Sequence, residues 1–278
     1  MRRPSAAVYS ALTFGFAFLY IPIFVVMVYS FNDARLMNVW NGASLRWYRE
    51  LFNSPQIIDA ALLSLEVAVL SATLATCLGA LAGLALTRMG RFRGRTLFSG
   101  MVAAPLVMPE VITGLSLLLL FVTLNSLTGW PASRGFTTIT IAHATFSAAY
   151  VAVMVQSRLG AMDQSLEEAA MDLGGRPFAV TLDITLPLIA PAMAAGWLLA
   201  FTLSLDEFVI TTFVTGAGAT TLPLEIFSRV RVGVTPEINA LATLIIVGVA
   251  TGVAVAGWIS LNRRTPGDGT LAQGDRSH

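Results

Sequence analysis

The sequence predicts an all-α membrane protein with six transmembrane helices, and three observations lead to that fold class. Apolar residues make up 55% of the 278 residues and charged residues only 12%, whereas soluble domains carry about 25% charged residues. The apolar residues gather in long runs. These runs are continuous, unlike the alternating strands of outer-membrane barrels. Lipid is therefore the expected solvent for most of the surface.

Each predicted span is a mostly apolar run close to the roughly 20 residues that a helix needs to cross a bilayer. The first run is too long for a cleaved signal peptide, and no small-residue cleavage site closes it, so we interpret it as a retained span. The six spans cover residues 8–31, 62–86, 98–124, 137–155, 188–205 and 238–261. They form one domain, residues 8–261, between an N-terminal segment, residues 1–7, and a tail, residues 262–278, whose glycine-rich and polar composition predicts disorder.

The placement of arginine predicts the orientation, because cytoplasmic loops carry an excess of basic residues. Most arginines flank the same ends of successive spans: Arg2, Arg3, Arg88, Arg91, Arg93, Arg95, Arg158, Arg176, Arg263 and Arg264. The arginines of the opposite side are spread thinly over longer loops: Arg35, Arg46, Arg49, Arg134, Arg229 and Arg231. We therefore expect both the N-terminus and the C-terminus in the cytoplasm.

Several function classes are excluded or disfavoured by composition. The net charge of +1 does not favour nucleic-acid binding. Cys77 is the single cysteine, and His143 and His278 share no metal-ligand spacing, so neither a disulfide framework nor a metal site is expected. All basic residues are arginine, and without lysine there is no phosphate-binding loop of the Gly-x4-Gly-Lys-Ser/Thr kind. With no catalytic motif either, we expect no enzyme and no cofactor in this chain.

Two outer loops are expected to be partly ordered. Ser44 is placed to cap a short helix over residues 45–52, whose aromatic residues suit a membrane interface. The second loop, residues 216–237, holds an apolar turn over residues 222–230. Both loops are open to two interpretations, anchoring at the membrane surface or contact with a partner protein.

One inner loop, residues 163–187, stands out. Its pattern predicts two short helices joined by a sharp turn. Ser165 with Glu168 three residues later fits a capping box. Gly174 stands where a left-handed C-terminal cap is expected, and Pro177 suits the first turn of a second helix. Spacing alone leaves open an ordinary interfacial helix pair.

The residues of this loop resemble the signature of ABC importer permeases, which is long and specific. The matching positions are Glu168, Ala169, Ala170, Gly174, Ile184, Leu186 and Pro187. The resemblance implies the type I importer permease fold with a cytoplasmic coupling helix, seated in a groove of an ATPase subunit. Gly175 departs from the pattern, which more often has alanine there; we expect this to loosen the turn without abolishing docking.

Further stretches are similar to the polyamine, putrescine-type branch of that family: residues 104–121, 201–208, 216–223 and 234–243. This likeness extends to about Leu261. It implies polyamine import across a bacterial inner membrane, with three kinds of partner: a second, different permease chain, an ATPase dimer using ATP and Mg, and a periplasmic polyamine-binding protein. Spermidine or another small substrate stays open, as does a proton-coupled carrier, although such a carrier has no need of the coupling motif.

Three acids are candidates for the substrate path. Glu110 lies twelve residues into the predicted third span, or about 18 Å at a helical rise of 1.5 Å per residue, and ionisable groups at such depth are costly. Asp206 and Glu207 follow the fifth span at its outer end. The alternatives are a protonated, hydrogen-bonded Glu110 and a solvated Asp206 and Glu207.

Overall fold

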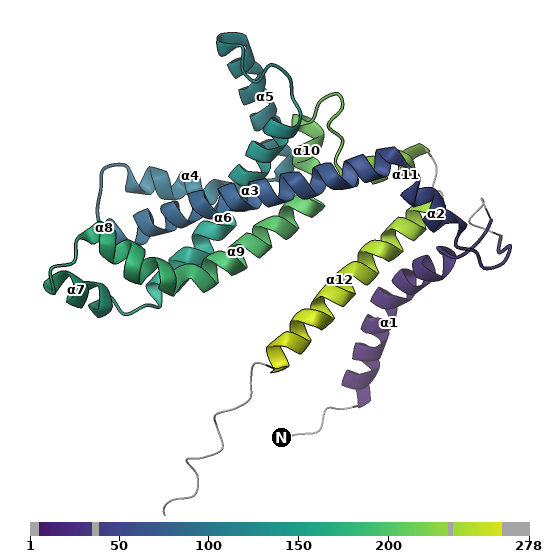
Figure 1. Cartoon of the computed structure of the whole chain (residues 1–278), viewed down its shortest axis with the longest axis horizontal. Helices are drawn as coiled ribbons and strands as arrows, with labels where there is room; N and C mark the ends of the chain where they lie inside the picture. Colours follow the sequence, from purple (N-terminus) through teal and green to yellow (C-terminus); the bar gives the residue numbers. More distant parts are fainter. Residues whose placement is uncertain (1–5, 35–38, 233–235, 263–278) are drawn as a thin grey trace, which may run out of the picture. The chain divides into compact units, whose positions relative to one another are not determined.

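The computed structural model describes residues 6–34, 39–232 and 236–262 (Figure 1), and within them it contains helices and no strand. The predicted first and last segments, residues 1–7 and 262–278, lie almost wholly outside the described residues. The helices are α1 (Ala6–Tyr29), α2 (Arg46–Phe52), α3 (Pro55–Arg88), α4 (Arg95–Val107), α5 (Glu110–Thr128), α6 (Phe136–Gly160), α7 (Ser165–Asp172), α8 (Pro177–Val180), α9 (Leu186–Asp206), α10 (Val209–Val214), α11 (Leu222–Val232) and α12 (Pro236–Asn262).

The chain divides into two compact units. One contains α1, α2 and α12, and the other runs from Pro55 to Ser228. Five of the described helices or helical stretches are long and apolar enough to cross a membrane: Val8–Tyr29, Pro55–Arg88, Glu110–Thr128, Phe136–Gly160 and Pro177–Asp206. The predicted sixth span lies within α12.

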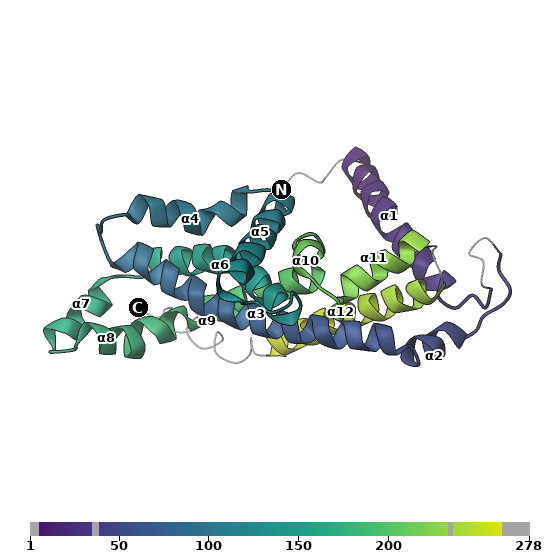
Figure 2. The ribbon, with the colours of Figure 1, turned by 90° about the horizontal axis from the view of Figure 1, so that it is seen from above.

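The larger unit is built on α3, α6 and α9, which lie side by side (Figures 1 and 2). Small residues allow this close packing. A Cβ at Gly79 would lie 2.7 Å from the Val151 Cβ, and one at Gly83 would lie 2.8 Å from Val155. The hydrophobic effect contributes little to helix association in lipid. Van der Waals contact between closely approaching backbones therefore holds the spans together. Buried alanines continue the same seam: Ala72, Ala75, Ala80, Ala152 and Ala200.

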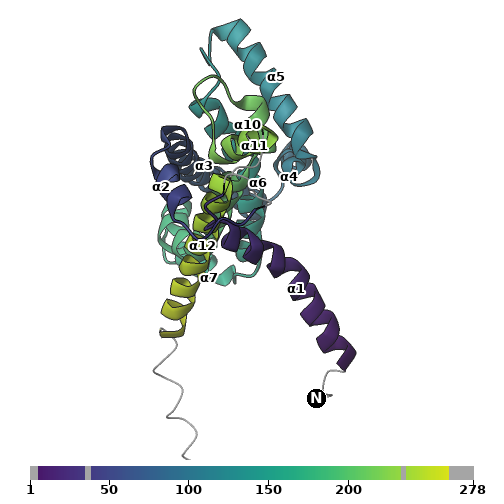
Figure 3. The same cartoon turned by 90° about the vertical axis from the view of Figure 1, so that its right-hand side faces the viewer.

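The predicted third span, residues 98–124, is not one helix. Met108 is extended, with ψ 138°, and α4 ends before it while α5 begins after Pro109. The cause is local, since proline lacks an N–H and pushes the residue before it out of the helical region. Figure 3 shows α5 lying across the direction of α4. The depth argument for Glu110 was therefore wrong, because it assumed one straight helix.

The predicted fifth span, residues 188–205, starts earlier than expected. From Pro177 the chain runs through α8, a π-helical turn at Thr181–Thr185 and α9 without leaving helical geometry. The second short helix of the inner loop is therefore the first turn of this span rather than a separate element. A π-helical turn adds one residue to a turn and shifts which side chains face each neighbour.

Residues 39–54 of the first outer loop belong to the smaller unit, where α2 packs against α12. The Ser44 hydroxyl accepts a hydrogen bond from the Arg46 N–H at 3.1 Å, so the helix begins within one residue of the prediction. Trp47 is buried, and its indole N–H donates to the Asn32 carbonyl at 2.7 Å. Trp47 therefore packs inside the smaller unit instead of presenting its ring to lipid.

Candidate functional site

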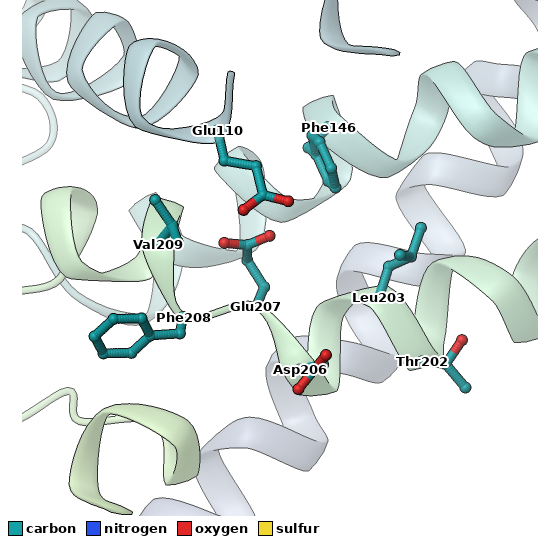
Figure 4. Close-up of a pocket in the computed structure, with 8 residues that line it drawn as sticks. All are labelled: Glu110, Phe146, Thr202, Leu203, Asp206, Glu207, Phe208 and Val209. Atoms are coloured by element: carbon teal, nitrogen blue, oxygen red, sulfur yellow. The ribbon is translucent and has the colours of Figure 1, made fainter. Parts of the chain in front are cut away.

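The three predicted path acids come together in one cavity. Glu110, Asp206 and Glu207 line a hollow of about 380 Å³ with five other residues, Phe146, Thr202, Leu203, Phe208 and Val209. In Figure 4 the carboxylates of Glu110 and Glu207 point toward each other across it. Glu110 also lines a second hollow, together with Pro105, Pro109 and Tyr150. The acid cluster thus brings together residues nearly a hundred positions apart.

Glu110 reaches this cavity because α5 packs tightly on α10. Gly114 lies one turn after Glu110 on the same helix face, and a Cβ there would lie 2.7 Å from the Phe213 ring and 3.2 Å from the Ile210 Cα. Only a residue without a side chain permits that approach. Since Gly114 faces α10, Glu110 faces the turn that leads into α10.

Glu207 is held by the break between α9 and α10. Its backbone is extended, with ψ 108°, where α9 ends at Asp206. Its side chain turns back, and Oε1 accepts a hydrogen bond from the Ile210 N–H at 2.8 Å. Glu207 is 6% exposed, whereas Asp206 and Glu110 are exposed. One acid is therefore fixed in direction, and two remain accessible.

The cavity has the chemistry of a cation site. None of its eight lining residues is basic. Two carboxylates facing each other repel while both are ionised, and a cation between them removes that repulsion. An opposite charge at 4 Å contributes about 4 kcal/mol at an effective dielectric near 20.

The inner loop ends α7 in a Schellman turn. Gly174 has φ +92°, and its N–H donates to the Met171 carbonyl at 2.9 Å. The Gly175 N–H donates to the Ala170 carbonyl, also at 2.9 Å. These two bonds define the motif, so the predicted left-handed cap at Gly174 is present. A Cβ at Gly175 would lie 2.7 Å from the Ala170 oxygen, so glycine tightens this turn rather than loosening it.

The predicted capping box between Ser165 and Glu168 does not form. Ser165 is the first residue of α7, and its N–H donates to the Asp163 carboxylate at 3.0 Å. This hydrogen bond lowers the pKa of the Asp163 carboxyl. The Asp163 carboxylate thus accepts the Ser165 N–H that the Glu168 side chain would accept in a capping box.

A second acid of the loop, Glu167, makes contacts that the sequence did not indicate. Its Oε2 lies 2.8 Å from the Arg88 Nε at the end of α3, and its Oε1 accepts a hydrogen bond from the Thr185 hydroxyl at 2.8 Å. Both charged side chains are mostly buried, at 18% and 13% exposure. The pair joins positions 79 residues apart, so no local spacing signals it.

The remaining residues of the predicted coupling set lie along the same stretch. Glu168 and Ala169 are exposed and Ala170 is half-buried on α7; Ile184 lies in the π-helical turn, and Leu186 and Pro187 begin α9. Large apolar side chains around them are open to solvent: Leu173 is 90% exposed and Phe178 is 75% exposed. Exposed apolar groups of this size are typical of a surface that another protein or the membrane covers.

Residues 75–262 match the family described as the binding-protein-dependent transport system inner membrane component. This chain belongs to that family. It is 56% identical over 252 residues to the putrescine transport system permease protein PotI of Escherichia coli strain K12, across 91% of this chain and 89% of that protein. It is 44% identical to the spermidine/putrescine transport system permease protein PotC of the same strain, across 85% and 87% of the two chains.

Solved structures of permease family members share the fold. A bacterial alginate ABC transporter in complex with an alginate-pentasaccharide-bound periplasmic protein aligns with a TM-score of 0.71 at 17% identity, covering 90% of each chain. An amino acid ABC transporter aligns with a TM-score of 0.53 at 21% identity, covering 78% of this chain and 97% of that one. The predicted all-α importer permease fold is therefore confirmed, and the expected membership of the ABC importer permeases is confirmed with it.

Proposed function

We propose that this chain is one of two permease subunits of an ATP-driven importer for polyamines, with putrescine as the preferred substrate. The observation that carries the substrate class is the cavity in which Glu110, Asp206 and Glu207 meet without a basic residue. A short diamine carries an ammonium at each end, and the facing carboxylates of Glu110 and Glu207 match such a dication. The chain is 56% identical to a putrescine permease and 44% identical to a spermidine/putrescine permease, and this difference supports putrescine as the preferred substrate.

The same proposal assigns the energy source and the partners. ATP and Mg are used by a separate ATPase dimer, because this chain has no lysine for a phosphate-binding loop. The ATPase docks on α7 and its cap through Glu168, Ala169, Ala170 and Gly174, with Ile184, Leu186 and Pro187 holding the loop to the start of α9. A second permease chain lines the other half of the path, and a periplasmic polyamine-binding protein delivers substrate.

The acids attract substrate without trapping it. Glu207 is fixed by the Ile210 N–H, and Glu110 approaches from a different helix. A relative movement of α5 and α10 changes the separation of the two carboxylates, and with it their combined attraction for a dication. A transient site of this kind binds in one state and releases in the other.

The test is uptake by the assembled importer in proteoliposomes, with radiolabelled putrescine or spermidine and with ATP inside or absent. We expect ATP-dependent uptake with a lower KM for putrescine than for spermidine. The Glu110→Gln, Asp206→Asn and Glu207→Gln triple variant should lose at least tenfold in uptake at unchanged amounts of assembled complex. Glu66→Gln, which removes an exposed acid of α3 that does not line this cavity, is the matched control and should stay near wild type.

Two outcomes contradict the proposal. Wild-type uptake by the triple variant eliminates the acids as a path. Uptake without ATP that a protonophore abolishes indicates a proton-coupled carrier instead.

A further inference from the structure

A continuous line of buried polar side chains runs behind the acid cavity, and His143 is at its centre. His143 is 1% exposed in the first half of α6. Its Nδ1 lies 2.7 Å from the Ser204 hydroxyl, and its Nε2 lies 2.8 Å from the Thr211 hydroxyl. Ser71 of α3 donates to Ser204 at 3.0 Å, and Thr211 donates to the Glu207 backbone carbonyl at 2.9 Å.

The imidazole bridges the break between α9 and α10. Ser204 belongs to the last turn of α9, and Thr211 belongs to the first turn of α10. Between them stands Glu207, whose extended backbone makes the break and whose side chain lines the cavity. One rigid ring therefore holds both sides of the turn that aims Glu207 at Glu110.

Counting hydrogens assigns the form of the ring. Thr211 has one hydroxyl hydrogen, which it gives to the Glu207 carbonyl, so its contact with His143 requires a hydrogen on Nε2. The Ser71 hydroxyl lies 3.0 Å from the Ser204 hydroxyl and 3.3 Å from the Ala68 carbonyl, and with its hydrogen on the nearer Ser204 the Ser204 hydrogen is left for Nδ1. With the hydrogen on Nδ1 instead, Nε2 would have to accept from Thr211, and the hydrogen bond from Thr211 to the Glu207 carbonyl would be lost. A doubly protonated ring satisfies them but buries a cation whose two partners are neutral hydroxyls, which is costly.

We propose that His143, as the neutral Nε2–H tautomer, is a positioning residue that sets the direction of the Glu207 carboxylate through Thr211. The inference rests on the proposed function of the cavity. His143 touches no substrate; it fixes the turn against α6, and Glu207 bonds back to Ile210 only when that turn is held. The sequence carried a signal for this role, since a histidine inside an apolar span is rarely accidental.

Two substitutions separate the two halves of the contact. In His143→Gln the amide nitrogen stands near the position of Nε2, so it donates to Thr211 and the link to the turn is kept. In His143→Asn the amide stands near the position of Nδ1, so it accepts from Ser204 but no longer reaches Thr211. Both replacements are neutral and smaller than histidine. Ser147→Ala, one turn further along α6 and equally buried, reports the effect of altered α6 packing alone.

The experiment uses the complete importer and two readouts, hydrogen exchange in nanodiscs and transport in proteoliposomes. Amide hydrogen exchange over residues 207–214 reports the turn without any substrate. Putrescine uptake, separated into KM and kcat, reports the path. We expect His143→Asn to speed exchange in this segment and to raise KM about tenfold. We expect His143→Gln to restore both to within about twofold of wild type, as does Ser147→Ala.

Each contrary result has a distinct meaning. Wild-type exchange in both variants at residues 207–214 overturns the proposal. Equal loss of protection in both variants across α3, α6 and α9, with less assembled complex, also overturns it and makes His143 a packing residue. Faster exchange in His143→Asn alone, with unchanged KM, upholds the positioning role and contradicts the proposed part of Glu207 in the path.

Discussion

At the scale of single residues, one backbone conformation decides where the chain goes after α7. Gly174 has φ +92°, which costs a residue with a Cβ roughly 1–2 kcal/mol. Open space surrounds the position where its Cβ would stand. The penalty for replacing Gly174 therefore comes from the backbone and not from a clash, which makes the residue a clean probe of the turn.

The first prediction concerns this turn. Gly174→Val should assemble in the membrane but lose most of its ATP-driven uptake, because a β-branched residue leaves the left-handed region and redirects the chain toward Pro177. Gly174→Asn is the matched control, since asparagine tolerates that region, and it should keep at least half of wild-type uptake. The measurement is putrescine uptake per unit of assembled complex. Normal uptake by Gly174→Val would count against the coupling role of the loop.

Single residues also mark the limit of what the sequence predicts. Gly174 and Pro177 were predictable because each acts on its own backbone. The capping box was wrong because the Asp163 carboxylate accepts the Ser165 N–H that the Glu168 side chain was expected to accept, and spacing rules do not rank competing acceptors. The meeting of Glu110 with Glu207 was expected only as a run of acids along the path, since their contact depends on how α5 and α10 pack.

At the scale of elements, a mostly buried ion pair ties the loop to the body of its unit. Glu167 of α7 contacts Arg88 at the end of α3 and Thr185 of the π-helical turn. A movement of α7 is therefore transmitted to two helices that pack on each other. Breaking a mostly buried pair leaves one charge uncompensated, which is more costly than never having the pair.

The second prediction follows from this pair. Glu167→Gln should lower ATP-driven uptake about fivefold, which corresponds to about 1 kcal/mol, while the amount of bound ATPase stays the same. Arg88→Glu alone should lower uptake further. The Arg88→Glu, Glu167→Arg double variant, which exchanges the two charges, should recover part of that uptake. The measurement is uptake per ATP hydrolysed. If the double exchange is no better than Arg88→Glu, the pair does not carry the coupling.

The same scale explains which helices were predicted well. Hydropathy alone placed the start of α6 within one residue, and the apolar run of this helix has no internal proline. The predicted third span failed at Met108 and Pro109, where hydropathy continues but the backbone does not. The start of the fifth span was missed because Thr181, Asp183 and Thr185 interrupt the apolar run before residue 188.

At the scale of the whole molecule, the orientation in the membrane decides which face meets the ATPase. The apolar side chains around the coupling residues are open, with Leu173 90% exposed. The arginines near this loop, Arg158 and Arg176, favour the cytoplasm for it. The loop between α5 and α6, which includes Ser133, should then face the periplasm.

The third prediction tests orientation and docking together. In a Cys77→Ser background, which removes the native exposed thiol, Leu173→Cys should react with a membrane-impermeant maleimide only from the cytoplasmic face. Ser133→Cys is the matched control and should react only from the periplasmic face. In inside-out vesicles the ATPase subunit should slow labelling at position 173 at least tenfold and leave position 133 unchanged, because docking covers the exposed leucine site. Labelling at position 173 from the periplasm would reverse the topology, and labelling from the cytoplasm that the ATPase leaves unchanged would place the docking surface elsewhere.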